Sequence, residues 1–193
     1  MRLFIASLLL SASLATPALA QDEPTADKEF QGFKIVSLVG VDQLNTPAVD
    51  ATGFFYGGTI GYDLQAGKAV YGIEGEVGDS TGSGCRTNVI VAGDTLCNTA
   101  RRDLYVGARA GVVIGQKTLL YVKAGYSNAQ ILGTYLVGPN GIGNTENLDG
   151  WRLGGGAEFN LSRKVFARGE YRYTNYDQGV SRHQGLIGLG IKF

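Results

Sequence analysis

The residues best suited to nucleophilic catalysis are Ser181 and His183, which lie two positions apart near the C-terminus. His183 is the only histidine in the chain. A working catalytic triad also needs a carboxylate that orients the imidazole from behind. No carboxylate lies beside this pair, although Glu170 or Asp177 could approach from the preceding stretch. We therefore expect an ordinary histidine at the rim of the fold, no catalytic residues and no enzymatic activity.

Cys85 and Cys97 are the only cysteines. A zinc site would need a third cysteine or a neighbouring histidine, which this segment lacks. In a protein exported to an oxidising compartment, an isolated pair of cysteines is expected to form a disulfide. Closing a loop of this length contributes about 3 kcal/mol in the chain-entropy model. The sequence predicts a Cys85–Cys97 disulfide and no metal.

Two glycine-rich runs have some likeness to phosphate-binding loops, at 138–143 (GPNGIG) and 185–190 (GLIGLG). A phosphate loop must lead into a helix, whose N-terminal N–H groups hold the phosphate. The first run lies in an expected loop, and the second lies inside a strand-like stretch that ends the chain. Neither run predicts a cofactor.

Alternation of apolar and polar residues with a period of two dominates the rest of the chain. In 150–161, every charged residue falls in one set of alternate positions, opposite Trp151, Leu153 and Phe159. This alternation is the signal of a β-strand whose two faces meet different surroundings. We predict eight strands, around 33–42, 54–63, 71–77, 104–112, 120–127, 150–161, 165–173 and 187–193.

The connections between these strands alternate between short and long. Short connections lie around 65–68, 115–117 and 162–164, and the longest connection runs from about 79 to 101. An antiparallel meander places all short turns at one end and all long loops at the other, as in outer-membrane barrels. Each stretch offers about 10 to 12 residues, enough for a tilted strand to cross a bilayer. The predicted fold is all-β, an eight-stranded antiparallel up-and-down transmembrane β-barrel.

Periodicity alone leaves open which face points inward, since a soluble lipocalin-like barrel would place its apolar face inside. The apolar sets of all eight stretches lack charged residues and carry aromatic residues at both ends. Two aromatic belts around an apolar band are typical of membrane interfaces. We expect Phe33, Tyr62, Tyr71, Phe159 and Phe193 at the short-turn end, and Phe54, Tyr56, Tyr126, Trp151 and Tyr173 at the long-loop end.

The polar sets would then line the lumen, together with many glycines that leave room for long side chains. An eight-stranded barrel is just wide enough for side chains to fill. Charges buried there must pair, because an unpaired buried charge costs several kcal/mol. We predict a lumen charge network of Glu74, Glu76, Arg109, Lys123, Arg152, Glu158, Arg168, Glu170, Arg172 and Lys192.

Composition and the N-terminus agree with an exported barrel. Lys and Arg number 17 and so do Asp and Glu, so no basic excess exists to bind nucleic acid. The 30 glycines argue against an all-α fold. Residues 1–20 combine Arg2, an apolar core and an A-x-A site, and so predict a cleaved signal peptide. We expect a flexible lead-in at 21–29 and one barrel domain over 30–193.

Four sequence segments resemble those of a known family: VFARGEYRYTNY (165–176), the C-terminal GVSRHQGLIGLGIKF, IEGE (73–76) and LYVKAGY (120–126). The sequence resembles the small outer-membrane β-barrel family, the opacity-type and porin-like surface proteins of Gram-negative and especially α-proteobacterial species. The resemblance covers the whole mature chain and implies the cell outer membrane as its location. It also implies that Phe193, a C-terminal aromatic residue, is recognised by the barrel-assembly machinery.

The family resemblance implies a specific fold but is compatible with several functions. We expect a monomer with a structural or surface-interaction role, surrounded by outer-membrane lipid. Its loops near Asn45, 79–101, 132–149 and 175–182 would meet an extracellular ligand or a host surface. The lumen is expected to be plugged by paired charges. The alternatives are a narrow porin-like channel for ions or small solutes and, from another class, a lipid A-modifying barrel enzyme.

Overall fold

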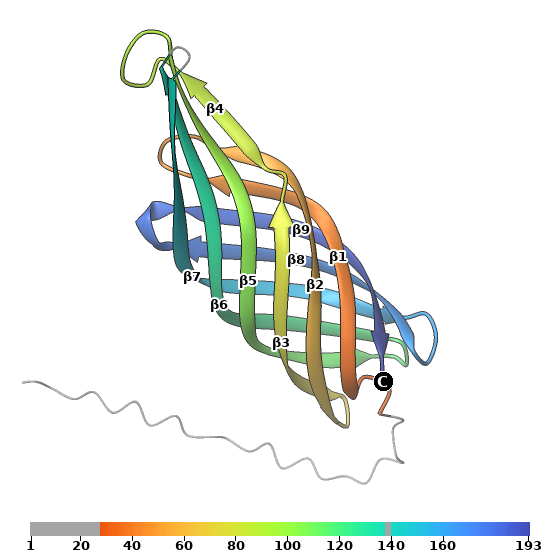
Figure 1. The fold of residues 1–193 in the computed structure, drawn as a ribbon. Helices are drawn as coiled ribbons and strands as arrows, with labels where there is room; N and C mark the ends of the chain where they lie inside the picture. Colours follow the sequence, from red (N-terminus) through yellow and green to blue (C-terminus); the bar gives the residue numbers. More distant parts are fainter. Residues whose placement is uncertain (1–27, 138–139) are drawn as a thin grey trace, which may run out of the picture.

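The computed structural model describes residues 28–137 and 140–193. Within these ranges, eight antiparallel strands form a closed ring in which β9 pairs back with β1 (Figure 1). The strands of the ring are β1 (Gly32–Asn45), β2 (Ala51–Ala66), β3 (Ala69–Ser80), β5 (Asp94–Ile114), β6 (Thr118–Val137), β7 (Asn140–Asn160), β8 (Val165–Tyr176) and β9 (Ser181–Lys192). The predicted barrel is confirmed. The predicted signal peptide at 1–20 and most of the lead-in at 21–29 lie outside the described residues.

Alternate side chains along each strand point to opposite faces of the barrel wall. Val39, Ile73 and Val106, for example, are 53%, 68% and 61% exposed on the outward face. The residues next to them in the sequence, such as Leu38, Glu74 and Tyr105, point the other way and are buried in the lumen. The outward face is therefore apolar and the lumen largely polar, which is the reverse of a soluble barrel.

Short turns gather at one end of the barrel, as predicted. Gly67 and Gly115 adopt positive φ angles in two of these turns, a conformation that glycine adopts without steric cost. Inside the lumen, glycine makes room for large neighbours. A Cβ atom on Gly78 would lie 2.2 Å from the Phe55 ring.

Three strands are much longer than predicted. The strands β5, β6 and β7 span 21, 20 and 21 residues, so the expectation of loops over 79–101 and 132–149 is wrong for most of these residues. Residues 81–82 and 88–93 do lie outside the strands, as expected. Beyond the apolar band both faces of a sheet meet water, so the strands continue to pair without the alternation that marks them in sequence. A further short strand, β4 (Ser83–Thr87), pairs with β5 and widens this projecting sheet (Figure 1).

The other two long-loop connections are short. Residues 46–50 join β1 to β2, and a single turn, η1 (Asp177–Gly179), joins β8 to β9. The projecting sheet therefore rises beyond them on one side of the barrel mouth (Figure 1).

Aromatic residues mark both ends of the outward apolar band. Nine of the ten predicted belt residues in the described ranges are exposed, and the tenth, Tyr173, is half-buried. The Tyr173 ring lies 5.7 Å from Trp151 and 4.9 Å from His183.

Apolar clusters in the lumen were not predicted. One lies at the short-turn end and contains Phe30, Val70 and Leu119. A second lies at the long-loop end and includes Leu44, Ile131 and Leu148. A third lies within the barrel and contains Val36, Leu38, Phe55, Phe166 and Leu186. No helix in the described part of the chain is long and apolar enough to cross a membrane.

Candidate functional site

The lumen between the two end clusters is filled by charged side chains. Within residues 28–137 and 140–193, seven cationic and seven anionic side chains are buried there, so their formal charges cancel. Every strand of the ring supplies at least one of them. The cations are Lys34, Arg109, Lys123, Arg152, Arg168, Arg172 and Arg182, and the anions are Asp42, Asp63, Glu74, Glu76, Asp103, Glu158 and Glu170.

At the short-turn end, ion pairs join β1, β2, β5 and β7. Lys34 pairs with Asp63, and Arg109 Nη2 lies 2.7 Å from the Asp63 Oδ2 atom. The same arginine places Nη1 2.7 Å from Glu158 Oε1. Arg168 Nη2 also lies 2.7 Å from that oxygen, which links the group to β8.

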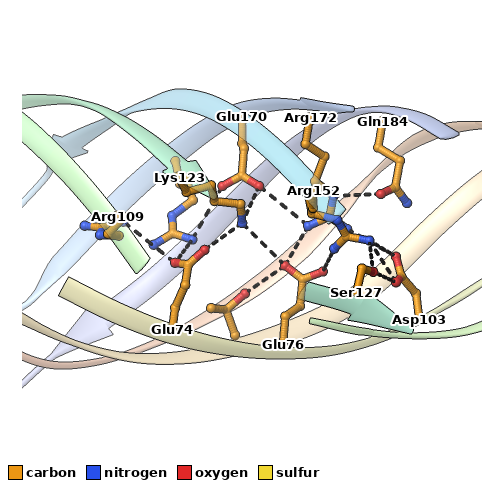
Figure 2. Close-up of polar contacts among 12 residues, drawn as sticks. Glu74, Glu76, Asp103, Arg109, Lys123, Ser127, Arg152, Glu170, Arg172 and Gln184 are labelled. Carbon is orange, nitrogen blue, oxygen red and sulfur yellow. Dashed lines mark hydrogen bonds and ion pairs between the residues drawn. The ribbon is translucent and has the colours of Figure 1, made fainter. Parts of the chain in front are cut away.

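In the middle of the lumen, Lys123 bridges two carboxylates (Figure 2). Its Nζ atom lies 2.6 Å from Glu74 Oε1 and 2.7 Å from Glu170 Oε1. Glu74 also reaches Arg168, 3.4 Å away, and Glu170 reaches Arg172, 3.5 Å away. These contacts connect the two halves of the network.

Towards the long-loop end, carboxylates and guanidinium groups continue to alternate. Glu76 lies 2.6 Å from Arg172 Nη1 and 3.3 Å from Arg152 Nη1 (Figure 2). Arg152 Nη2 then lies 2.6 Å from Asp103 Oδ2, and Arg182 Nη1 lies 3.3 Å from the same oxygen.

The last link joins Arg182 to Asp42, with 2.6 Å between Nη2 and Oδ2. A single path of ion pairs therefore visits all fourteen charges along the barrel and alternates in sign at every step. Burying these charges is costly, and pairing each with an opposite charge offsets that cost. Aromatic rings add to the packing, because Arg109 lies 4.6 Å from the centre of the Tyr121 ring and Arg152 lies 5.1 Å from that of Tyr105.

The structure places nine of the ten predicted lumen charges on this path. The exception is Lys192, which is only partly buried at the short-turn end. It donates hydrogen bonds to Asn160 Oδ1, 3.0 Å away, and to the Glu29 carbonyl oxygen, and its Nζ lies 5.2 Å from the centre of the Phe30 ring. It is placed there because β9 reaches the end of the barrel at this residue.

Sequence reasoning missed five members of the path. Lys34, Asp42 and Asp63 lie on the inward parity of the first two stretches, so the alternation itself could have identified them. Asp103 lies directly before the 104–112 stretch and Arg182 lies five residues before the 187–193 stretch, where the strands continue without a clear alternation.

Within the described residues, the Ser181–His183 pair makes no hydrogen bond to a carboxylate. His183 lies on the outward face, where its Nδ1 atom is 2.7 Å from the Tyr171 hydroxyl oxygen. Glu170 lies on the other side of the barrel wall and binds Lys123 in the lumen. Asp177 is exposed in η1.

A disulfide and several hydrogen bonds connect the described strands of the projecting sheet near its tip. Cys85 and Cys97 form a disulfide between β4 and β5, which confirms the predicted bond. In the turn that follows β4, the Asp94 carboxylate accepts hydrogen bonds from the backbone N–H groups of 89, 90 and 91 at 2.6, 2.8 and 3.0 Å, and from the Tyr135 hydroxyl at 2.8 Å. Burial alone would raise the pKa of Asp94, and these hydrogen bonds overcome it and lower the pKa to about 2.

This ordered tip presents apolar side chains to solvent. The exposed residues are Val89, Ile90, Val91, Leu136, Val137 and Ile142. No charged residue occurs over 87–93 or 132–145. Nearer the barrel, a cavity of about 310 Å³ lies between the projecting sheet and the two short loops, lined by Thr46, Pro47, Asn98, Ile131, Glu146 and Val180 among others.

Phe193 lies at the short-turn end and is 72% exposed. Its backbone N–H donates to the Phe33 carbonyl oxygen over 2.9 Å, and the two rings are 6.2 Å apart. The C-terminal residue is therefore joined to the first strand where the ring closes.

Comparisons with known proteins agree with this architecture. A family model described as the outer membrane protein beta-barrel domain matches residues 6–193. The chain is 27% identical to the 25 kDa outer-membrane immunogenic protein of Brucella ovis over 139 residues, which are 71% of this chain and 62% of that protein. It is 25% identical to the 22 kDa outer membrane protein of Rhizobium leguminosarum bv. viciae over 194 residues, covering 90% of this chain and 83% of the relative.

Among solved structures, Neisserial surface protein A superposes with a TM-score of 0.57 at 13% identity, covering 84% of this chain and 97% of that one. This likeness concerns the fold.

Proposed function

Because the chain belongs to the outer membrane protein β-barrel domain family, we propose that it is a monomeric surface protein with a closed lumen and a projecting extracellular interaction surface. The protein is located in the outer membrane of a Gram-negative bacterium. Residues 1–20 would be removed on export, and 21–29 would form the lead-in to the barrel. The short turns would then face the periplasm and the projecting sheet the outside.

The observation that carries the closed lumen is the neutral path of fourteen paired charges between two apolar clusters. An ion entering the lumen would have to pass Phe30 and Leu119 at one end and Ile131 and Leu148 at the other. It would also have to displace buried ion pairs, whose separation leaves charges uncompensated in a region of low dielectric constant. Both barriers to ion passage support the proposal that the paired charges plug the lumen and have a structural role.

Planar-bilayer recording tests the closed lumen directly. We expect no steady conductance from the purified wild-type protein. The double variant Glu76→Ala/Arg152→Ala keeps the lumen neutral and removes two long side chains from its middle, so it serves as a partly opened comparison. Steady, reproducible conductance of the wild-type barrel would contradict the closed lumen and support a narrow channel.

The channel remains the second candidate because some buried polar atoms beside the path lack hydrogen-bond partners. Among the described residues, the Tyr105 hydroxyl and Gln184 Nε2 are two of them. Such groups could contact a passing ion or small solute. The same recordings decide between the two functions.

The projecting sheet supports a role in surface interaction. Its tip is stiffened by the disulfide and by Asp94, and yet it exposes Ile90 and Ile142, which are 74% and 77% accessible. Rigid display lowers the entropy lost on binding, and exposed apolar area supplies the gain. An extracellular ligand or a host surface would therefore contact the tip.

Adhesion of cells displaying the protein to animal-cell monolayers tests this role. We expect Ile90→Ser/Ile142→Ser to reduce adhesion. The control Gln178→Ser, in the exposed turn η1 between β8 and β9, should leave adhesion unchanged. Equal adhesion of all three proteins at equal surface amounts would argue against the tip.

Two further parts of the proposal concern assembly and chemistry. Phe193 would be recognised by the barrel-assembly machinery before the ring closes. No enzymatic step is proposed, because His183 meets a tyrosine and not a carboxylate. Altered mass of lipid A from expressing cells would contradict this and favour a lipid A-modifying enzyme.

A further inference from the structure

An irregularity in β5 places two arginines on the outward face of the barrel. Ala100 pairs with Ile131 and Asp103 pairs with Ala129, so Arg101 and Arg102 both oppose the single residue between those partners on β6. This two-against-one arrangement is a β-bulge. Ala100 and Asp103 are buried, whereas Arg101 and Arg102 are both exposed. With strict alternation, one of the two arginines would have pointed into the lumen.

The position of the bulge relative to the aromatic belt determines what these arginines can meet. On the outward face, Val106, Tyr126 and Trp151 form one row of paired residues, and Leu104 lies in the next row outward. Arg102 precedes Leu104 by two residues in the sequence and lies farther outward. It is four residues from Val106 in the belt row, about 13 Å along the strand, and less in height because barrel strands are tilted. This level corresponds to the headgroup region of the outer leaflet, beyond the hydrocarbon core.

The guanidinium groups at this level are available to bind an anion. In the described part of the chain, neither Arg101 nor Arg102 lies within ion-pair distance of a carboxylate. Arg102 Nη2 donates instead to Asn128 Oδ1 at 3.0 Å and to Asn147 Oδ1 at 3.4 Å, which holds the side chain across β6 and β7.

Among the described residues, two acidic groups lie beside the arginines on this face, and neither forms an ion pair with them. Asp79 on β3 follows Gly78, which pairs with Asp103, and its Oδ1 atom accepts a hydrogen bond from the Ser80 N–H at 2.7 Å. Asp149 on β7 is occupied by neighbouring donors. It accepts hydrogen bonds from the Tyr126 hydroxyl and from Asn128 Nδ2, the latter at 2.6 Å. The amide of Gln130 extends the same surface and donates to Asn147 Oδ1 over 3.5 Å. Two positive charges therefore stand among amide groups, above an aromatic row, on the side of the wall that faces lipid.

We infer that Arg101 and Arg102 bind the phosphate of a phosphorylated glycolipid in the outer leaflet. Planar guanidinium groups match phosphate oxygens in pairs, and the amides of Asn128, Gln130 and Asn147 suit sugar hydroxyl groups. Tyr126 and Trp151 would pack beside the sugar and the start of the acyl chains. Basic residues next to a membrane-spanning segment are a common means of recognising anionic lipids. The inference rests on the location of the protein and is independent of the proposed surface interaction.

Trp151 allows a direct measurement, because it is the only tryptophan in the chain and lies in the row below the arginines. Bisphosphorylated lipid A would be titrated into refolded barrel in zwitterionic detergent micelles while Trp151 fluorescence is followed. Dephosphorylated lipid A and inorganic phosphate serve as comparison probes. Folding of each variant is checked by heat-modifiable gel mobility.

We expect Arg101→Gln/Arg102→Gln to weaken binding of bisphosphorylated lipid A by about twenty-five-fold, or about fivefold for each arginine. The matched control, Arg163→Gln/Lys164→Gln, removes two exposed cations at the opposite end and should change affinity less than about twofold. Dephosphorylated lipid A should bind the wild-type protein as weakly as the double variant binds the phosphorylated lipid.

Three results would overturn the inference. Equal loss in both double variants would show that general charge attraction is responsible. Equal binding of phosphorylated and dephosphorylated lipid A would remove the phosphate from the interaction. Competition by inorganic phosphate at concentrations comparable to those of lipid A would assign the arginines to a soluble anion and not to a lipid.

Discussion

Replacing Asp103 by asparagine removes the carboxylate that joins three buried arginines near the long-loop end. Its oxygens lie 2.6 Å from Arg152 Nη2 and 3.3 Å from Arg182 Nη1, and it also accepts a hydrogen bond from the Ser127 hydroxyl at 3.0 Å. The asparagine is nearly the same size, so packing changes little and the lost charge dominates. Breaking a buried ion pair by removing one partner typically costs about 3–5 kcal/mol.

We therefore expect Asp103→Asn to lower the free energy of unfolding by about 3–5 kcal/mol, at the upper end because two short ion pairs are lost together. The assay is urea unfolding of the barrel refolded into phospholipid vesicles, followed by Trp151 fluorescence. The control is Asp177→Asn, an exposed acid in η1, which should change the free energy of unfolding by less than about 0.5 kcal/mol.

A double-mutant cycle separates the charge effect from a general effect of substitution. Asp103→Asn/Arg152→Gln removes one anion and one cation, so the lumen stays neutral. The double variant should be less destabilised than the sum of the single variants by about 1–3 kcal/mol. The reasoning is refuted if Asp103→Asn costs less than about 1 kcal/mol, or if the two single effects add.

Three other predictions concern the ends of the barrel. Because the folded pKa of Asp94 lies at about 2, below its unfolded value of about 3.9, its contribution to the turn is complete above about pH 5 and is lost as the pH falls through about 2. The protection factors of the 89–91 amides, referenced to intrinsic exchange at each pH, should fall over that window in the wild type, and protection factors that stay constant would contradict the assignment. The Cys85–Cys97 disulfide should make the protein two hydrogen atoms lighter than its reduced form by mass analysis, and finding both thiols open to alkylation in membrane-recovered protein would exclude it. Phe193→Ala should reduce folded barrel in the outer membrane, by heat-modifiable mobility, far more than Phe159→Ala does, and equal yields from the two variants would reject an assembly signal at Phe193.

The number of membrane-spanning strands and their orientation could be predicted from the sequence. Within the apolar band each outward side chain meets lipid and each inward one meets the lumen, so the pattern is local and repeats every two residues. The parity of Glu74 and Glu76 opposite Ile73 and Val77 is enough to place both carboxylates inside. The disulfide could also be predicted from the sequence, because the chain has two cysteines and they can pair in only one way.

The ends of the strands could not be predicted in this way. In 132–149, small and polar residues on both faces resemble a loop, and yet the residues continue β6 and β7. Backbone hydrogen bonds between strands form whatever the side chains are, so pairing extends as long as the neighbouring strand extends. The bulge at Arg101 and Arg102 could not be predicted from the sequence either, because it depends on the register of β5 against β6.

The sequence by itself determined which face of the barrel each charged residue occupies within the apolar band. Only the tertiary structure decided which charges meet. Lys34 and Glu158 lie 124 positions apart and Asp42 and Arg182 lie 140 apart, on strands whose facing side chains are set by the closure and tilt of the ring. The alternation of residues along a strand indicates whether a side chain meets lipid or the lumen. Which opposite charge it contacts there depends on the three-dimensional register of all eight strands.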